Sequence, residues 1–213
     1  MRRRVAVLIS GRGSNMAALL AAAAHPDYPA EIALVLSNVP AAPGLDLARR
    51  AGVASAVVDH RPFRGDRAAH EAAIDAALRE RGIELVCLAG YMRLLTPFLV
   101  DRWAGRMLNI HPSLLPAFPG LHTHARALAA GVALHGCTVH LVTHATDAGP
   151  ILAQAAVPVL PGDDEATLAA RVLAQEHRIY KLALAMVAGS APPPRPAPQT
   201  AFCNPLPVGP WGE

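Results

Sequence analysis

Short apolar runs alternate with longer helical segments along most of this chain, and that alternation limits the folds it can adopt. Residues 4–9 form an apolar run typical of a buried strand, and the Ala- and Leu-rich stretch 16–24 predicts a helix. The alternation continues with expected strands over 32–36, 54–58, 85–89 and 107–110 and expected helices over 44–51, 66–81 and 122–130. Elements that alternate at this spacing predict an α/β fold: a doubly wound, mostly parallel sheet with helices on both faces.

The later part of the chain breaks this alternation. Expected strands over 138–142 and 151–159 have no helix between them, which predicts antiparallel pairing. A long helix is expected over 164–187, with Asp163 and Asp164 as candidates for its N-cap.

The composition changes at Ser190, because eight prolines fall in the last 24 residues. Such a stretch cannot continue a helix and shows no apolar periodicity. We therefore expect one domain over 1–189, followed by an extended or disordered Pro-rich tail over 190–213.

Composition and charge argue for a globular chain without a nucleic-acid partner. Hydrophobic residues make up 53% of the sequence and charged residues 16%, which is typical of a packed interior. The net charge of +3 comes from scattered arginines with one run at 2–4, and only 4% of residues are aromatic. A nucleic-acid groove would need a basic stripe with interleaved aromatic side chains.

Cysteine usage and hydropathy predict a cytoplasmic protein. Cys87 and Cys137 lie in apolar runs, Cys203 lies far from both, and no C-x-x-C motif occurs, so buried free thiols are expected. The apolar run at 5–9 is too short for a secretory signal segment, and no run reaches membrane-spanning length.

A glycine-rich loop follows the first expected strand. Gly11 and Gly13 let the main chain approach a ligand, and Ser14 and Asn15 add side-chain donors or an N-cap at the next helix. A dinucleotide fingerprint would need a third glycine where Met16 stands, and no Gly-Lys-Ser/Thr of an ATP-binding loop occurs. The loop therefore favours a small phosphorylated substrate; the alternative is a plain strand-to-helix turn.

Asn109 and His111 form the candidate catalytic pair. Residues two apart on a strand point to the same face, and Pro112 ends the strand just beyond them. A neutral donor beside a titratable one suits a developing oxyanion and a proton transfer, and Asp147 in a later turn could supply a carboxylate. The alternative is that Asn109 and His111 merely finish a strand and cap the next turn.

Ten histidines raise the alternative of a metal site. His122, His124, His135, His140 and His144 could be grouped around zinc, but no H-E-x-x-H or Cys-rich spacing occurs. We therefore expect no metal. His140 alternates with apolar neighbours, as a hydrogen-bonded core residue would.

Several motifs together resemble the phosphoribosylglycinamide formyltransferases, the folate-dependent formyltransferase family of purine biosynthesis. The matching motifs are LISGRGSN at 8–15, LAGYMRLL at 88–95, LNIHPSLLP at 108–116, PGLHTH at 119–124, HGCTVH at 135–140, DAGPIL at 147–152, RV at 171–172 and QEHRIY at 175–180. The likeness covers roughly residues 4–188. It implies a Rossmann-like formyltransferase fold with 1–189 as the catalytic domain.

The resemblance also implies a reaction. The amine of glycinamide ribonucleotide would attack the formyl carbon of 10-formyltetrahydrofolate, a cosubstrate, without a metal. Asn109 would donate to the formyl oxygen as it becomes an oxyanion. His111 would do the same when protonated and act as general acid, and an ionised Asp147 would favour the protonated ring.

The resemblance assigns binding residues as well. Gly13, Ser14, Asn15 and Glu176 would hold the ribonucleotide. Folate would contact Arg67, Met92, Arg93, Leu94, Leu95, Asn109, Thr143, His144, Ala145, Thr146 and Asp147. Leu94 and Leu95 also have a simpler interpretation as core residues.

Two positions depart from the family pattern. His144 stands where an acidic residue is usual, and Ala148 stands where the first glycine of a Gly-Gly pair is usual. Ala148 would restrict a position that could use a positive φ. Both departures put folate affinity in doubt and leave the catalytic trio intact.

Other functions remain as alternatives. Formyltetrahydrofolate hydrolase would carry a further N-terminal domain, and methionyl-tRNA formyltransferase a C-terminal RNA-binding domain; we expect neither here. A non-catalytic binding module of the same fold would not need the trio. The sequence is compatible with a monomer or a homodimer.

Overall fold

The computed structural model describes residues 1–189, so the expected tail over 190–213 and the position of Cys203 lie outside the described residues. The strands are β1 (Arg3–Ile9), β2 (Ala30–Ser37), β3 (Ser55–Val57), β4 (Leu85–Leu88), β5 (Met107–His111), β6 (Leu134–Leu141) and β7 (Ile151–Pro158). The helices are α1 (Ser14–Ala23), α2 (Gly44–Arg50), η1 (Arg61–Phe63), α3 (Arg67–Glu80), α4 (Pro97–Arg102), α5 (Thr123–Ala129) and α6 (Glu165–Ala188).

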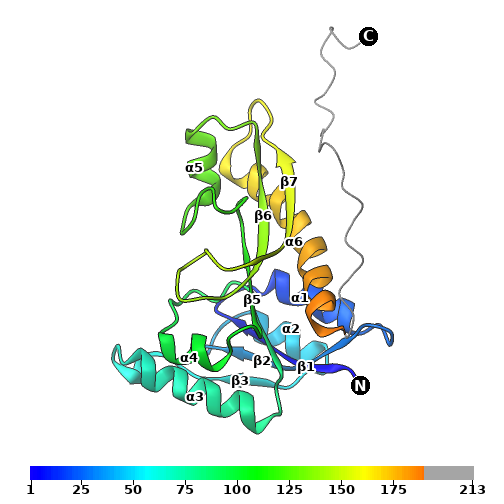
Figure 1. The fold of residues 1–213 in the computed structure, drawn as a ribbon, viewed down its shortest axis with the longest axis vertical. Coiled ribbons are helices and arrows are strands. Elements are labelled where there is room, and N and C mark those ends of the chain that lie inside the picture. Colours follow the sequence, from blue (N-terminus) through cyan, green and yellow to red (C-terminus); the bar gives the residue numbers. More distant parts are fainter. Residues whose placement is uncertain (190–213) are drawn as a thin grey trace.

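All of these strands join one seven-stranded sheet in the order β3-β2-β1-β4-β5-β6-β7 (Figure 1). Pairing is parallel from β3 to β5 and antiparallel for β5–β6 and β6–β7. The expected doubly wound, mostly parallel sheet with antiparallel late strands is confirmed. The chain order reverses beside β1, which pairs with both β2 and β4, and such a reversal opens a crevice at the carboxyl ends of the strands.

Each face of the sheet carries its own apolar core. Along β1, Val5, Val7 and Ile9 face a core that includes residues of α1, α2, α5 and α6. Ala6 and Leu8 face the opposite core, built with α3 and α4. Because neighbours on a strand point to opposite faces, a continuous apolar run is what a strand covered on both sides requires.

Tyr180 anchors the long helix α6 on the sheet. Its side chain is fully buried, and its hydroxyl lies 3.0 Å from the carbonyl oxygen of Leu88 and 3.3 Å from that of Leu108. Since Leu88 ends β4 and Leu108 lies near the start of the neighbouring β5, the contact fixes α6 across these two strands. No helix within residues 1–189 is both long and apolar enough to span a membrane.

The structure differs from the sequence-based expectations at three elements. The sequence does not predict η1 or α4, which are too short for a clear apolar period, although Thr96-Pro97 is a typical helix start. Strand β6 begins at Leu134, four residues before the expected 138. It extends because residues 134–137 pair with β7, a long-range contact that local strand propensity does not report.

Both described cysteines are free and buried, as expected. Each lies in the apolar core that contains α6. Burial raises the pKa of both thiols to about 12, so neither is a nucleophile at neutral pH.

Helix α6 begins with a capping box at Asp164, one of the two expected candidates. Asp164 Oδ1 accepts from the Thr167 backbone N–H at 2.8 Å, and Thr167 Oγ1 accepts from the Asp164 N–H at 2.9 Å. Asp163 instead pairs with Arg171 at 2.6 Å.

Replacing Asp164 with Ala should therefore lower the free energy of unfolding by about 1 kcal/mol, because the Thr167 N–H at the helix start loses its acceptor. Chemical denaturation of both proteins measures the difference. Asp164→Ser keeps a capping oxygen and should stay close to the parent. Equal losses in the two variants would contradict the capping role.

Candidate active site

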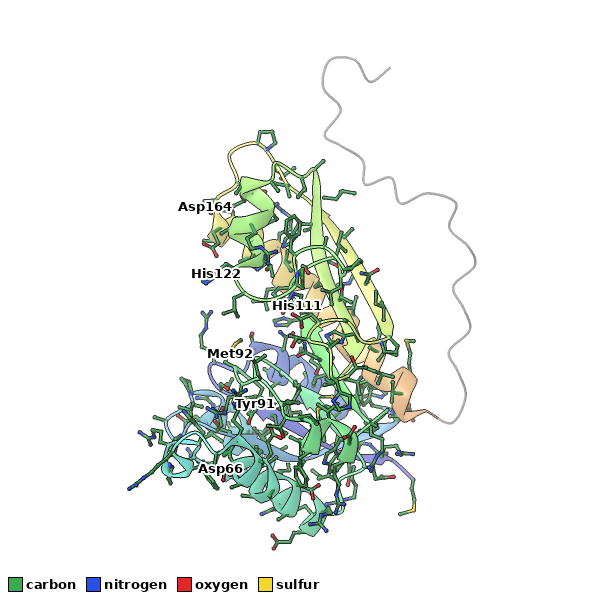
Figure 2. The ribbon with its side chains drawn as sticks, turned by 60° about the vertical axis from the view of Figure 1, so that its left-hand side comes forward. Asp66, Tyr91, Met92, His111, His122 and Asp164 are labelled. Atoms are coloured by element: carbon green, nitrogen blue, oxygen red, sulfur yellow. The ribbon has the colours of Figure 1, made fainter. Side chains whose placement is uncertain are left out.

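The carboxyl ends of β1 and β5 carry the residues singled out from the sequence. Asn109 and His111 both lie in β5, two residues apart, and His111 is its last residue. Figure 2 shows His111 at a height between Met92 below and His122 above. The topology therefore places the candidate pair at the edge where ligands bind in open α/β sheets.

The loop between β6 and β7 brings Asp147 to His111. Asp147 Oδ1 lies 3.5 Å from His111 Nδ1, and both side chains are less than a tenth exposed. Asp147 Oδ2 accepts from the Gly120 backbone N–H at 2.8 Å. Asp147 has a φ of 54°, a left-handed conformation that Asp tolerates better than most residues. The structure thus brings together the three predicted catalytic residues.

The contacts of the His111 ring suit a protonated imidazole. Its Nε2 lies 3.1 Å from the carbonyl oxygen of Phe118, which can only accept, so Nε2 carries a hydrogen. Its Nδ1 faces the Asp147 carboxylate. A 3.5 Å separation is long for a direct hydrogen bond but short for an attraction between opposite charges.

His140 joins this site, a residue that the sequence suggested as a core residue or as one of the candidate zinc ligands. It is 2% exposed and pairs with Asn109 across β5 and β6. Its Nδ1 donates to the Leu141 carbonyl at 2.9 Å, and burial lowers its pKa, so the ring is neutral and Nε2 is an acceptor. The Asn109 Nδ2–H therefore donates to His140 Nε2 at 3.2 Å, which fixes the amide orientation. The sequence did not predict this role, because His140 alternates with apolar neighbours along β6 as a core residue would.

Replacing His140 with Leu should lower kcat about tenfold with little change in KM, because Asn109 loses the acceptor that orients it. Steady-state kinetics of the reaction proposed below measure both constants. His140→Asn can still accept from Asn109 and should recover part of the loss. An unchanged kcat in His140→Leu would contradict the positioning role.

The glycine-rich loop leads into α1 as expected, with one correction. The N-cap of α1 is Gly13, in the left-handed region at φ 76°, and neither Ser14 nor Asn15 caps the helix through its side chain. A Cβ on Gly13 would lie 3.2 Å from Gly44 Cα, so the loop packs closely on the start of α2. A Cβ on Gly11 would meet no atom within 4 Å, so of these two loop glycines only Gly13 packs closely against other parts of the chain.

Asn15 and Glu176 meet across 161 residues of sequence. Asn15 Nδ2 donates to Glu176 Oε2 at 2.6 Å, and both side chains are buried. Asn15 Oδ1 is buried without a partner within residues 1–189. A buried acceptor of this kind is free for a ligand hydroxyl or amine. The four residues expected to hold a ribonucleotide thus include a contacting pair with spare hydrogen-bonding capacity.

Burial raises the pKa of Glu176 above its ordinary value of 4.5, although the Asn15 hydrogen bond opposes this. The folded state then binds this proton more tightly than the unfolded state. Stability is therefore expected to fall as pH rises from 4.5 through the folded-state pKa. Glu176→Gln should flatten this slope and raise Tm at neutral pH by a few degrees. Thermal unfolding against pH tests this, with the exposed Glu165→Gln as control. An unchanged slope would contradict it.

The residues expected to contact folate lie around the same edge. Met92 and Leu94 are 71% and 62% exposed, so Leu94 is not a core residue, while Leu95 packs against the core on the α3 side. The Met92 N–H donates to Ser10 Oγ at 2.8 Å, which ties this segment to the end of β1. Arg67 is exposed at the start of α3. Arg93 is half-buried.

The loop over 143–147 contacts α4 through His144, the residue of the loop that departs from the family pattern. His144 Nε2 lies 2.8 Å from Asp101 Oδ1, and both side chains are more than half exposed. His144 thus pairs with α4. Thr143 is half-buried, whereas Ala145 and Thr146 are exposed.

Ala148 does not have the conformation that raised doubt about it. Asp147 has the positive φ, and Ala148 does not. Gly149 is the position that needs glycine, since a Cβ there would lie 1.7 Å from the Leu141 carbonyl oxygen. The Ala148 substitution is therefore compatible with the loop, and Asp147 carries the strain.

The histidines considered for zinc are dispersed. His124 Nδ1 lies 3.2 Å from His135 Nε2, but His140 contacts Asn109 and His144 contacts Asp101. Among residues 1–189, no three His, Cys, Asp or Glu side chains are grouped to hold a metal ion.

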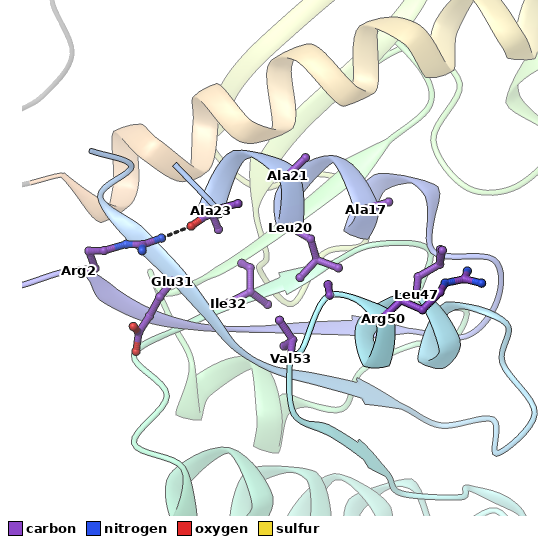
Figure 3. A pocket seen from close by; sticks show the side chains of 12 residues that line it. Arg2, Ala17, Leu20, Ala21, Ala23, Glu31, Ile32, Leu47, Arg50 and Val53 are labelled. Atoms are coloured by element: carbon purple, nitrogen blue, oxygen red, sulfur yellow. Dashed lines mark hydrogen bonds between the residues drawn. The ribbon is translucent and has the colours of Figure 1, made fainter. Parts of the chain in front are cut away.

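A cavity of about 620 Å³ lies away from the trio, between α1, α2 and β2. Figure 3 shows its apolar lining, including Leu20, Ile32 and Val53, with Arg2 and Glu31 toward one end. None of the trio lines it. Since it holds no acid–base pair aimed at one point, the candidate active site is the polar cluster at β5 instead.

Comparison with known proteins shows the family of this chain. The formyl transferase family model matches residues 3–184. This chain belongs to the formyl transferase family. It is 44% identical over 184 residues to phosphoribosylglycinamide formyltransferase of Escherichia coli (strain K12), covering 86% of each chain. The crystal structure of phosphoribosylglycinamide formyltransferase from Brucella melitensis has a TM-score of 0.85 and 57% identity, covering 90% of this chain and 98% of that one.

A longer relative also matches. The human trifunctional purine biosynthetic protein adenosine-3 is 50% identical over 187 residues, which cover 88% of this chain and 18% of the relative. The chain spans less than a fifth of the trifunctional relatives it matches.

Proposed function

We propose that this chain transfers the formyl group of 10-formyltetrahydrofolate to the amine of glycinamide ribonucleotide. The observation that carries the proposal is the convergence of Asn109, His111 and Asp147, with Asp147 Oδ1 at 3.5 Å from the His111 ring. The likeness to the Escherichia coli and Brucella melitensis enzymes supports the same reaction. The trio needs no covalent enzyme intermediate, because the substrate amine is itself the nucleophile.

In this proposal, attack of the amine on the formyl carbon places negative charge on the formyl oxygen. Asn109, held by His140, directs its second N–H to that oxygen. His111, charged and held beside Asp147, stabilises the same oxygen and supplies a proton as the carbon–N10 bond breaks, directly or through water. The amine loses a proton, so the products are formylated ribonucleotide and tetrahydrofolate.

The start of α1 is proposed to bind the phosphate of the ribonucleotide. Gly13 and Ser14 present backbone N–H groups at a helix N-terminus, which favours an anion. The free Oδ1 of Asn15 and the Glu176 carboxylate would accept from its hydroxyl or amine groups.

Folate is proposed to lie between the 92–95 segment and the 143–147 loop, with Arg67 near its outer part. Exposed Met92 and Leu94 offer apolar surface, and backbone groups of the loop offer hydrogen bonds. An enzyme of this pathway would act in the cytoplasm, and the two buried free thiols are typical of a reducing compartment.

Absorbance of tetrahydrofolate released from a 10-formyl donor tests the reaction, with and without glycinamide ribonucleotide. We expect release only when the ribonucleotide is present. Tetrahydrofolate release at the same rate without the ribonucleotide would indicate the alternative, formyltetrahydrofolate hydrolase. Binding of both ligands without turnover would overturn the enzymatic proposal.

A further inference from the structure

A second cavity, of about 440 Å³, opens between the end of α3 and α4. Its lining combines three arginines, two aspartates, a tryptophan and an isoleucine. Ile83 precedes β4 and Arg106 precedes β5, so the cavity lies at the amino ends of these strands. It is therefore at the opposite edge of the sheet from Asn109 and His111.

A buried carboxylate organises this cluster. The Asp75 side chain is 2% exposed, and its Oδ1 accepts from Trp103 Nε1 at 3.1 Å. Its Oδ2 lies 2.9 Å from Arg79 Nε and 3.3 Å from Arg102 Nε. The Asp75 carboxylate thus pairs with both guanidinium groups, in each case through the Nε atom.

This arrangement leaves the outer ends of both guanidinium groups available. Within residues 1–189, the terminal nitrogens of Arg79 and Arg102 donate no hydrogen bond, and the ion pairs to Asp75 are made through Nε. Their side chains are 59% and 49% exposed, so these ends reach the cavity opening. Paired N–H groups on a planar fork match the oxygens of a phosphate or carboxylate.

Arg106 adds a third, fixed positive charge. Its Cζ lies 4.8 Å from the centroid of the Trp103 ring, and its Nη2 donates to the Arg102 carbonyl at 2.7 Å. Asp75 balances one of the three arginine charges, and Asp101, which also lines the cavity, balances a second, so one net positive charge remains. The cluster therefore keeps an excess of positive charge that faces solvent.

We propose that this cavity binds a small oxyanion of the phosphate-monoester class, at a site separate from the one that performs the reaction. The buried Asp75 pre-orients the forks, and Trp103 and Ile83 form the apolar wall. No step of the proposed formyl transfer uses these residues.

Trp103 provides a local readout of binding. The sequence has two tryptophans, so a Trp211→Phe background leaves Trp103 as the single tryptophan, which can be excited selectively over the tyrosines. We expect inorganic phosphate, titrated at constant ionic strength, to give a saturable change in Trp103 emission. A parallel titration with malonate distinguishes a preference for tetrahedral phosphate from general binding of dianions.

Matched variants make the test decisive. Arg102→Gln and Arg106→Gln should each weaken phosphate binding about tenfold, and each leaves Asp75 at least one arginine. Arg50→Gln, beside the other cavity, removes the same charge and should change nothing. Asn15→Ala, at the proposed ribonucleotide site, should also leave the Trp103 response unchanged.

A response that is absent, that does not saturate, or that persists equally in Arg102→Gln and Arg106→Gln would overturn the anion site. A stronger response to malonate than to phosphate would overturn the assignment of ligand class. Neither result bears on the proposed formyl transfer, which the tetrahydrofolate assay tests by itself.

Discussion

Replacing His111 with Gln is expected to lower kcat/KM for formyl transfer by about 10²–10⁴-fold. Gln retains an N–H that can reach toward the Phe118 carbonyl but cannot carry a positive charge or deliver a proton. The loss should fall on kcat, because the charge is needed only when the formyl oxygen becomes an oxyanion. Steady-state kinetics with varied ribonucleotide and varied folate measure the two constants separately.

Two comparisons separate this result from a folding defect. Thermal unfolding of His111→Gln should match the parent within a few degrees, since the side chain volume and one hydrogen bond are kept. His25→Gln, at an exposed histidine, should keep full activity. A near-native kcat in His111→Gln would show that His111 is not the acid.

Replacing Asp147 with Asn should lower kcat about 10²-fold or more. Asn keeps the shape, can accept from the Gly120 N–H and tolerates the left-handed conformation at φ 54°. It removes only the negative charge that stands 3.5 Å from His111 Nδ1. The substitution thus isolates the electrostatic contribution of Asp147 to the charged ring.

The double variant gives the sharper test of this mechanism. If Asp147 acts through His111, then His111→Gln combined with Asp147→Asn should be little slower than His111→Gln alone. Fully multiplicative losses would indicate that Asp147 acts on the substrate independently. Asp27→Asn, which removes an exposed carboxylate, serves as the control for net charge.

The sequence predicted the sheet because local periodicity reports it. Apolar runs such as 5–9 are required where a strand is covered on both faces, and the alternation with helices specifies parallel connections. The short helix α4 and the first residues of β6 were beyond this kind of reasoning. Their conformation depends on packing and on pairing with β7 rather than on their own pattern.

The candidate site likewise has some features that follow from the sequence and others that depend on the fold. The spacing of Asn109 and His111 and their position at the end of a strand follow from the sequence alone. The contact of Asp147 with His111, the acceptor role of His140 and the pairing of Asn15 with Glu176 do not. These contacts join residues 31 or more positions apart, so they depend on the strand order, on the path of the β6–β7 loop and on the packing of α1 against α6.

By itself, the sequence thus determined an α/β sheet, the family and the chemical types of the side chains that we propose as catalytic. The tertiary structure decided which of them meet, which histidine orients the Asn109 amide, and that Asp147 adopts the left-handed conformation. The physical reason is range: periodicity and turn residues encode neighbours along the chain, whereas hydrogen bonds and charge pairs act between atoms that folding brings within a few ångströms.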